Sequence, residues 1–132
     1  MKTMKAILIA IVCILLFTLP AEGINWMHVT STDNARFYVD IDSIKQAEKP
    51  IVEAWTKWVY NEPKIAKELN DYVAHVSTHR EYNCEERKTR ELEQSAYNKE
   101  HRVVAHNPYK MSWFDVPPKT ALSELLELIC QF

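Results

Sequence analysis

The chain has 132 residues, 47% of them hydrophobic, a formal net charge of −2 and a single glycine. The length fits one domain, and the lack of a basic excess argues against nucleic acid as a partner. Because the glycine is Gly23, the chain beyond it lacks the residues that phosphate-cradling loops, dinucleotide fingerprints and nucleophile elbows require. Those enzyme classes are therefore excluded.

Residues 1–23 have the pattern of a secretory signal peptide. Two lysines precede an apolar run over residues 6–19, and about 14 apolar residues are too few for a helix that spans a bilayer. Small residues at positions 21 and 23 predict cleavage before Ile24. We therefore expect a mature domain over residues 24–132, with 14 basic and 17 acidic side chains and no transmembrane segment.

Cys13 raises the alternative of a lipid-anchored protein. A lipobox requires a small residue before the cysteine, but Val12 stands there, and the apolar run continues through Phe17. We therefore expect Cys13 to be discarded with the signal peptide.

The first half of the mature chain predicts short strands. Residues 26–31 and 36–40 read as a hairpin, and we expect Asp33 and Asn34 to supply the positive φ angles of its turn. An Asp and Ser turn over 40–44 and a polar connector over 45–50 follow. Residues 51–60 give the strongest strand signal, and Pro63 is expected to end it before one or two helical turns within residues 64–70.

The second half predicts further strands and one helix. The side chains of residues 72–84 alternate between two faces, which predicts a long strand. Residues 85–88 are expected to form the charged turn of a hairpin, and further strands are expected at 89–97, 103–105 and 111–116. Thr120 is the expected N-cap of a C-terminal helix whose apolar stripe has helical spacing: Leu122, Leu125, Leu126 and Ile129.

Two cysteines remain in the mature chain, Cys84 and Cys130. Small exported domains often use a disulfide to supplement a modest core, so we expect these two to be paired. The predicted fold class is α+β: an antiparallel β-sheet of about five to six strands with a C-terminal α-helix packed on it and one disulfide.

The histidines suggest a metal or haem site, but their spacing argues against one. On a strand, His75 and His79 share a face but lie about 13 Å apart, too far to bind one ion. We expect surface histidines, and no metal or other cofactor, at the five positions: His28, His75, His79, His101 and His106.

The remaining candidates are aromatic and charged residues. Trp55 and Trp58 should lie on opposite faces of their strand, either packing in the core or, for an exposed one, anchoring a partner. The charged run over residues 80–93 is interpreted as a solvated hairpin, with a docking surface as the alternative. No Ser, Cys or His has a recognisable nucleophile context, so no catalytic residue is expected.

Taken in order, several short motifs resemble the surface-adhesin protein E-like family of exported bacterial domains. The likeness covers nearly the whole mature chain, and its most specific parts are Tyr-Val-Asp-x-x-Ser-Ile and the two cysteines. It is carried by Trp26, Phe37 to Ile44, Val52 to Trp55, Tyr82 to Cys84, Tyr97, Trp113, Pro117 to Thr120 and Cys130.

The resemblance implies a single antiparallel sheet with a C-terminal helix tied by a disulfide. It also implies a non-enzymatic domain on the bacterial surface that binds host extracellular-matrix or plasma glycoproteins, and that can form a homodimer. The named adhesin type is lipid-anchored, whereas this chain lacks a good lipobox. The alternative is a periplasmic accessory domain that binds a small ligand or an envelope protein.

Overall fold

The computed structural model describes residues 25–132, so the expected signal peptide and Cys13 lie outside the described part of the chain. Along the chain the elements are β1 (Trp26–Ser31), β2 (Ala35–Asp40), η1 (Ile41–Ser43), β3 (Lys45–Glu48), β4 (Ile51–Ala66), η2 (Lys67–Leu69), β5 (Asp71–Asn83), β6 (Lys88–Tyr97), β7 (Val103–Asn107), β8 (Phe114–Asp115) and α2 (Ala121–Ile129).

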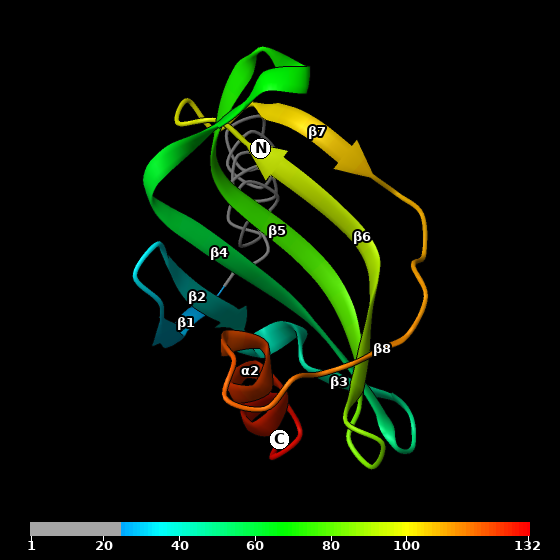
Figure 1. The fold of residues 1–132 in the computed structure, drawn as a ribbon. Helices are drawn as coiled ribbons and strands as arrows, with labels where there is room; N and C mark the ends of the chain where they lie inside the picture. Colours follow the sequence, from blue (N-terminus) through cyan, green and yellow to red (C-terminus); the bar gives the residue numbers. More distant parts are fainter. Residues whose placement is uncertain (1–24) are drawn as a thin grey trace, which may run out of the picture.

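The strands form one antiparallel sheet in the order β1-β2-β4-β5-β6-β7, with β3 added to β4 and β8 added to β6 (Figure 1). The sheet over residues 25–132 thus has eight strands, which corrects the expected five to six. β3, which has four residues, lies in the stretch expected to be a polar connector, whereas β8, which has two, lies inside the strand expected at 111–116. All four residues of β3 are exposed, so this strand lacks the alternating burial pattern that reveals a strand in a sequence.

The expected end of the fourth strand at Pro63 is wrong. β4 continues to Ala66, and its pairing with β5 shifts register between Val59 and Lys64. Pro63 lies inside this irregular stretch, where a missing N–H costs no regular ladder bond. The helical part of this region is only the short turn η2, which Asn70 ends with a left-handed φ of 50°.

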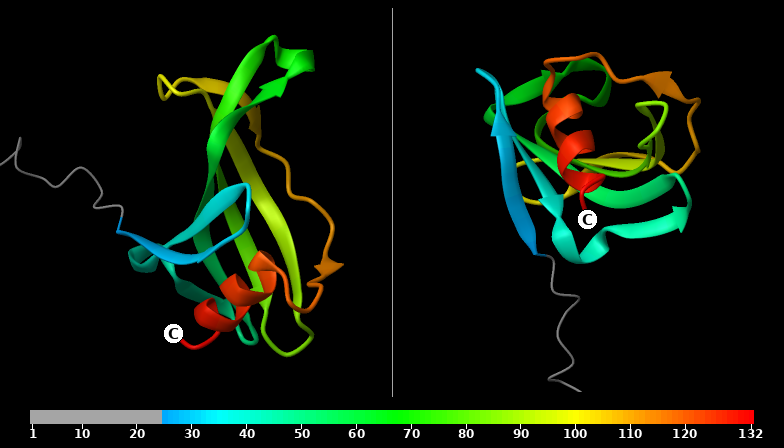
Figure 2. Two further views of the ribbon diagram at one scale, coloured as in Figure 1. Left: turned by 60° about the vertical axis from the view of Figure 1, so that its left-hand side comes forward. Right: turned by 90° about the horizontal axis from the view of Figure 1, so that it is seen from below.

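Helix α2 begins where the sequence predicts it. The Thr120 hydroxyl accepts a hydrogen bond from the Ser123 N–H at 3.1 Å, which fixes the first turn. Figure 2 shows the sheet curling around the helix. The core forms between them and consists of Val39, Val52, Ala54, Tyr82, Val116, Leu125, Leu126 and Ile129.

A disulfide joins Cys84, just after β5, to Cys130 at the end of α2, with the two Cα atoms 5.8 Å apart. This fits the pairing expected from the sequence. The bond closes a loop with a sequence separation of 46 residues, for which the chain-entropy model gives about 4 kcal/mol of stabilisation. It fastens the helix to the same end of the sheet that the core occupies.

Without glycine, the turns use other residues in the left-handed region. Asn70, Arg87, His101 and Lys119 have φ angles of 50°, 55°, 63° and 60°. The first hairpin turn needs no such residue, which corrects the expectation for residues 33 and 34. The Thr32 hydroxyl instead accepts a hydrogen bond from the Ala35 N–H at 3.2 Å.

Candidate functional site

The two faces of the sheet differ in what covers them. Trp58 lies on the face that α2 partly covers, whereas Trp55 lies on the open face and stacks on His79 with ring centroids 4.9 Å apart. The two tryptophans therefore occupy opposite faces, as their spacing predicts. Both are half-buried, so neither is a freely exposed anchor.

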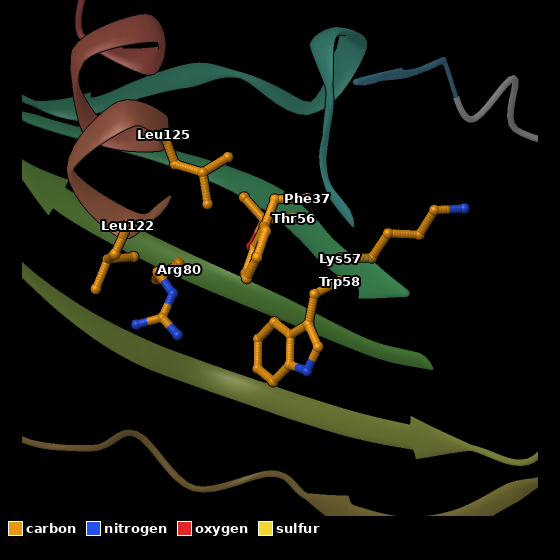
Figure 3. Close-up of a pocket in the computed structure, with 7 residues that line it drawn as sticks. All are labelled: Phe37, Thr56, Lys57, Trp58, Arg80, Leu122 and Leu125. Atoms are coloured by element: carbon orange, nitrogen blue, oxygen red, sulfur yellow. The ribbon is translucent and has the colours of Figure 1, made fainter. Parts of the chain in front are cut away.

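A half-open pocket of about 200 Å³ lies between α2 and the covered face of the sheet. We call it the α2 pocket, and it is lined by Phe37, Thr56, Lys57, Trp58, Arg80, Leu122 and Leu125. Figure 3 shows the Lys57 side chain directed away from the other six. Its Nζ lies 4.6 Å from the centroid of the Trp26 ring on the open face, so Arg80 is the charged side chain that the pocket retains.

Arg80 is only 5% exposed, and its guanidinium is only partly satisfied. Its Nη2 donates to Glu91 Oε1 at 3.1 Å, and Gln94 Nε2 donates to the same oxygen at 3.4 Å. Arg80 Nη1 is buried and has no hydrogen-bond partner within residues 25–132. A buried donor without an acceptor costs free energy, so this atom marks a place where an oxygen atom would be favourable.

A second buried polar atom lies beside this cluster. The Tyr82 side chain is fully buried, and its hydroxyl also lacks a partner in the described chain. The Thr56 hydroxyl is close, but it donates its own hydrogen to the Thr78 carbonyl oxygen at 3.4 Å. Burial raises the pKa of Tyr82 to about 12, against smaller opposing effects of Arg80 and Thr56.

The open face carries histidines packed against aromatic rings. His28 contacts Tyr38 edge to face, and His75 stacks on Tyr97 with ring centroids 4.7 Å apart and also lies beside His101. Burial, and then the charges of Lys57 and His101, lower the pKa of His75. Each of these histidines is thus part of an aromatic pair and not of a common site.

Exposed apolar side chains gather at the far end of the β4–β5 hairpin, which projects beyond the rest of the sheet (Figure 2). Ile65 and Tyr72 are direct cross-strand partners, and they are 64% and 51% exposed. Leu69, in the connecting turn, is 42% exposed. We call these three residues the hairpin tip, and exposed apolar groups of this kind are typical of contact surfaces.

Comparison with protein families gives a match over residues 26–131 to the family described as surface-adhesin protein E. The chain belongs to this family. The adhesin E assignment confirms the resemblance seen in the sequence motifs. It supports the description of the protein as an adhesin-like surface protein. No curated protein matches the chain.

The fold of this adhesin E domain is similar to solved structures of protein E from Haemophilus influenzae. One matches with a TM-score of 0.59 and 18% identity, covering 80% of this chain and 83% of the other. A second crystal form matches with a TM-score of 0.61 and 18% identity, covering 80% of this chain and 87% of the other. Protein E from a non-typeable strain matches with a TM-score of 0.58 and 18% identity, covering 85% of this chain and 80% of the other. At this identity the likeness supports the fold.

The side chains that could bind a metal ion are dispersed in the described part of the adhesin E domain. Within residues 25–132, no three or more His, Cys, Asp or Glu side chains gather closely enough to hold a metal ion. His75 and His79 lie on the open face, each stacked on a different aromatic ring. No helix of the described chain is long and apolar enough to cross a membrane.

Sequence reasoning missed the α2 pocket and misjudged the charged run over residues 80–93. Arg80 and Glu81 are 5% and 8% exposed, so the run is not simply a solvated hairpin. A usable signal was present, because Arg80 lies between Thr78 and Tyr82 in the alternation that predicts the inward face. A charged residue on an inward face indicates a buried polar cluster or a binding site.

Proposed function

We propose that this protein is an exported, non-enzymatic binding domain that attaches to host extracellular-matrix or plasma glycoproteins through its hairpin tip. The mature domain comprises residues 24–132, and residues 1–23 direct its export. Membership of the surface-adhesin protein E family is the observation that carries the proposal. The exposed tip supplies the apolar surface that a protein contact requires.

The hairpin tip suits this role because it is separated from the parts that hold the fold together. The core and the disulfide lie at the helix end of the sheet, whereas Ile65, Leu69 and Tyr72 pack against none of the core residues. Tyrosine and bulky aliphatic side chains bury large areas when a partner covers them. A change at the tip can therefore alter binding without altering stability.

The test measures binding of the mature domain to immobilised matrix and plasma glycoproteins at physiological salt. The double variant Leu69→Ser/Tyr72→Ser is expected to bind at least tenfold more weakly than the wild type. Tyr109→Ser/Phe132→Ser removes two exposed apolar residues that lie outside the hairpin tip and should bind normally. Absence of saturable binding to every glycoprotein would refute the adhesive function, and equal losses in both variants would refute the role of the tip.

The alternative is a periplasmic accessory domain, and the α2 pocket is the observation that favours its small-ligand form. Protease treatment of intact cells separates the two functions. Digestion without lysis supports the surface location, whereas protection until the outer membrane is opened supports the periplasmic one.

A homodimer through an edge strand is part of the same proposal. In the described sheet β1 and β7 end the main strand order, and β7 begins with Val103, which is 57% exposed. An uncharged edge strand can pair with a second copy. Sedimentation of the wild type should show a dimer that Val103→Lys weakens, and a monomer at all concentrations would exclude this interface.

A further inference from the structure

We propose that the α2 pocket binds a small organic monocarboxylate, whose apolar body of one ring or a short acyl chain lies among Phe37, Trp58 and Leu122 and whose carboxylate accepts hydrogen bonds from Arg80 Nη1. This site is separate from the hairpin tip. It lies beneath α2, on the face of the sheet that the helix partly covers. The inference does not depend on the adhesive function proposed above.

The walls and size of the pocket define the body of the ligand. Two aromatic and two leucine side chains, Phe37, Trp58, Leu122 and Leu125, provide most of its lining. Its volume is about 200 Å³, and an apolar protein cavity of roughly 150 Å³ is enough to hold benzene. A single ring or a chain of about six carbons therefore fits, whereas a large planar cofactor does not.

Arg80 defines the head of the ligand. Its unpartnered Nη1 is buried, and Figure 3 shows the guanidinium among the lining side chains near Leu122. A carboxylate forms the strongest bond with such a donor because both partners are charged. The other charged lining residue, Lys57, points away, so Arg80 alone determines the charge preference of the pocket.

Glu91 weakens the preference of the pocket for an anionic ligand, and a substitution of Glu91 can therefore test that preference. Its carboxylate already accepts from Arg80 Nη2 at 3.1 Å, so it competes with an anionic ligand for the same guanidinium. Replacing Glu91 with glutamine keeps an oxygen acceptor beside Arg80 but removes the negative charge. An anionic ligand should then bind more tightly, whereas a neutral ligand should be unaffected.

The experiment titrates the mature domain with phenylacetate while the indole Nε1–H signal of Trp58 is followed by NMR. Phenylacetamide is a control that has the same ring as phenylacetate but a neutral head group. Acetate is a control that has the carboxylate but no apolar body. Phenylacetate should shift the Trp58 signal saturably and bind at least tenfold more tightly than either control. Arg80→Gln should weaken phenylacetate binding at least tenfold, and Glu91→Gln should strengthen it several-fold.

The matched control uses the neighbouring ion pair on the same two strands. Arg90 Nη2 lies 2.8 Å from Glu81 Oε1, and Arg90 also stacks over Trp113, outside the α2 pocket. Glu81→Gln and Arg90→Gln should leave phenylacetate binding unchanged. They show whether the loss of any charge from this part of the sheet changes affinity.

Three results would overturn the proposal. These are no saturable shift of Trp58, equal binding of phenylacetate and phenylacetamide, or weaker binding of phenylacetate to Glu91→Gln. The last variant keeps the inference testable even if Arg80→Gln fails to fold. Glycoprotein binding by the same samples is measured separately, because failure of either property leaves the other intact.

Discussion

Arg80 on β5 and Glu91 on β6 are cross-strand partners directly after a register shift, with Nη2 and Oε1 3.1 Å apart. The Arg80 side chain is 6% exposed and that of Glu91 is 24% exposed, so the arginine is the more deeply buried member. Removing Glu91 would leave a buried cation without its counter-ion, which costs more than removing both charges together.

The first prediction concerns the stability of this pair. Glu91→Ala should lower the free energy of unfolding by about 2 kcal/mol or more, because Arg80 loses its acceptor. The double variant Arg80→Met/Glu91→Leu should lose less than Glu91→Ala alone. Urea denaturation of the wild type, Arg80→Met, Glu91→Leu and the double variant gives the coupling energy, and additive effects would show that the pair is not coupled.

The second prediction concerns Tyr82, whose buried hydroxyl has no partner in the described chain. Tyr82→Phe should change stability at pH 7 by less than about 1 kcal/mol, because no hydrogen bond is lost. Since the folded-state pKa of Tyr82 is raised to about 12 from 10.0, folding favours the neutral phenol. Wild-type stability should therefore fall as the pH rises above about 10.

Tyr82→Phe should show a shallower loss of stability between pH 10 and 12. Tyr109→Phe is the control, because that side chain is 75% exposed. Chemical denaturation across this pH range makes the comparison. Identical alkaline profiles for the wild type and Tyr82→Phe would contradict the prediction.

The third prediction concerns acid pH and His75. Burial, together with the charges of Lys57 and His101, holds its pKa below the usual 6.5. The folded state then binds this proton less readily than the unfolded state, so stability is retained above pH 6.5 and falls as the pH drops. Replacing His75 with Gln should flatten the decline between pH 7 and 5, measured by thermal unfolding; the same replacement at the exposed His28 should not.

The fourth prediction concerns Lys119, which precedes the N-cap of α2 and has a φ of 60°. A side chain in the left-handed region carries a conformational cost that glycine avoids. Lys119→Gly should therefore raise the free energy of unfolding by about 1 kcal/mol. Lys110→Gly, at a position without positive φ, should give no gain; a loss in both variants would show that the turn stores no such cost.

The fold could be predicted where burial imposes a period on the sequence. Alternation along residues 72–84 indicates β5, and the spacing of Leu122, Leu125 and Leu126 indicates α2. β3 could not be predicted because its four residues are exposed and pair with β4 only in the folded protein. The extension of β4 past Pro63 could not be predicted because it depends on a register shift, which leaves no pattern in the local sequence.

The α2 pocket could be predicted less well, because it is made by residues from four separate elements. The pattern places Arg80 on the inward face, but it gives no indication that Phe37 on β2 and Leu122 on α2 lie near it. The distance between the helix and the sheet decides whether a cavity remains, and that distance follows from the packing of Leu125 and Leu126. Side-chain packing of this kind cannot be read from strand and helix periods.

The bond between Cys84 and Cys130 has a further consequence for the α2 pocket. Leu122 and Leu125 form one wall of the pocket, and both lie on the helix whose last turn this bond holds against the sheet. With the thiols reduced, the helix would depend on its apolar contacts alone and the wall would loosen. The oxidation state of two sulfur atoms would thus determine when the α2 pocket takes its final shape, which requires an oxidising environment, whereas the separate hairpin tip would not depend on it.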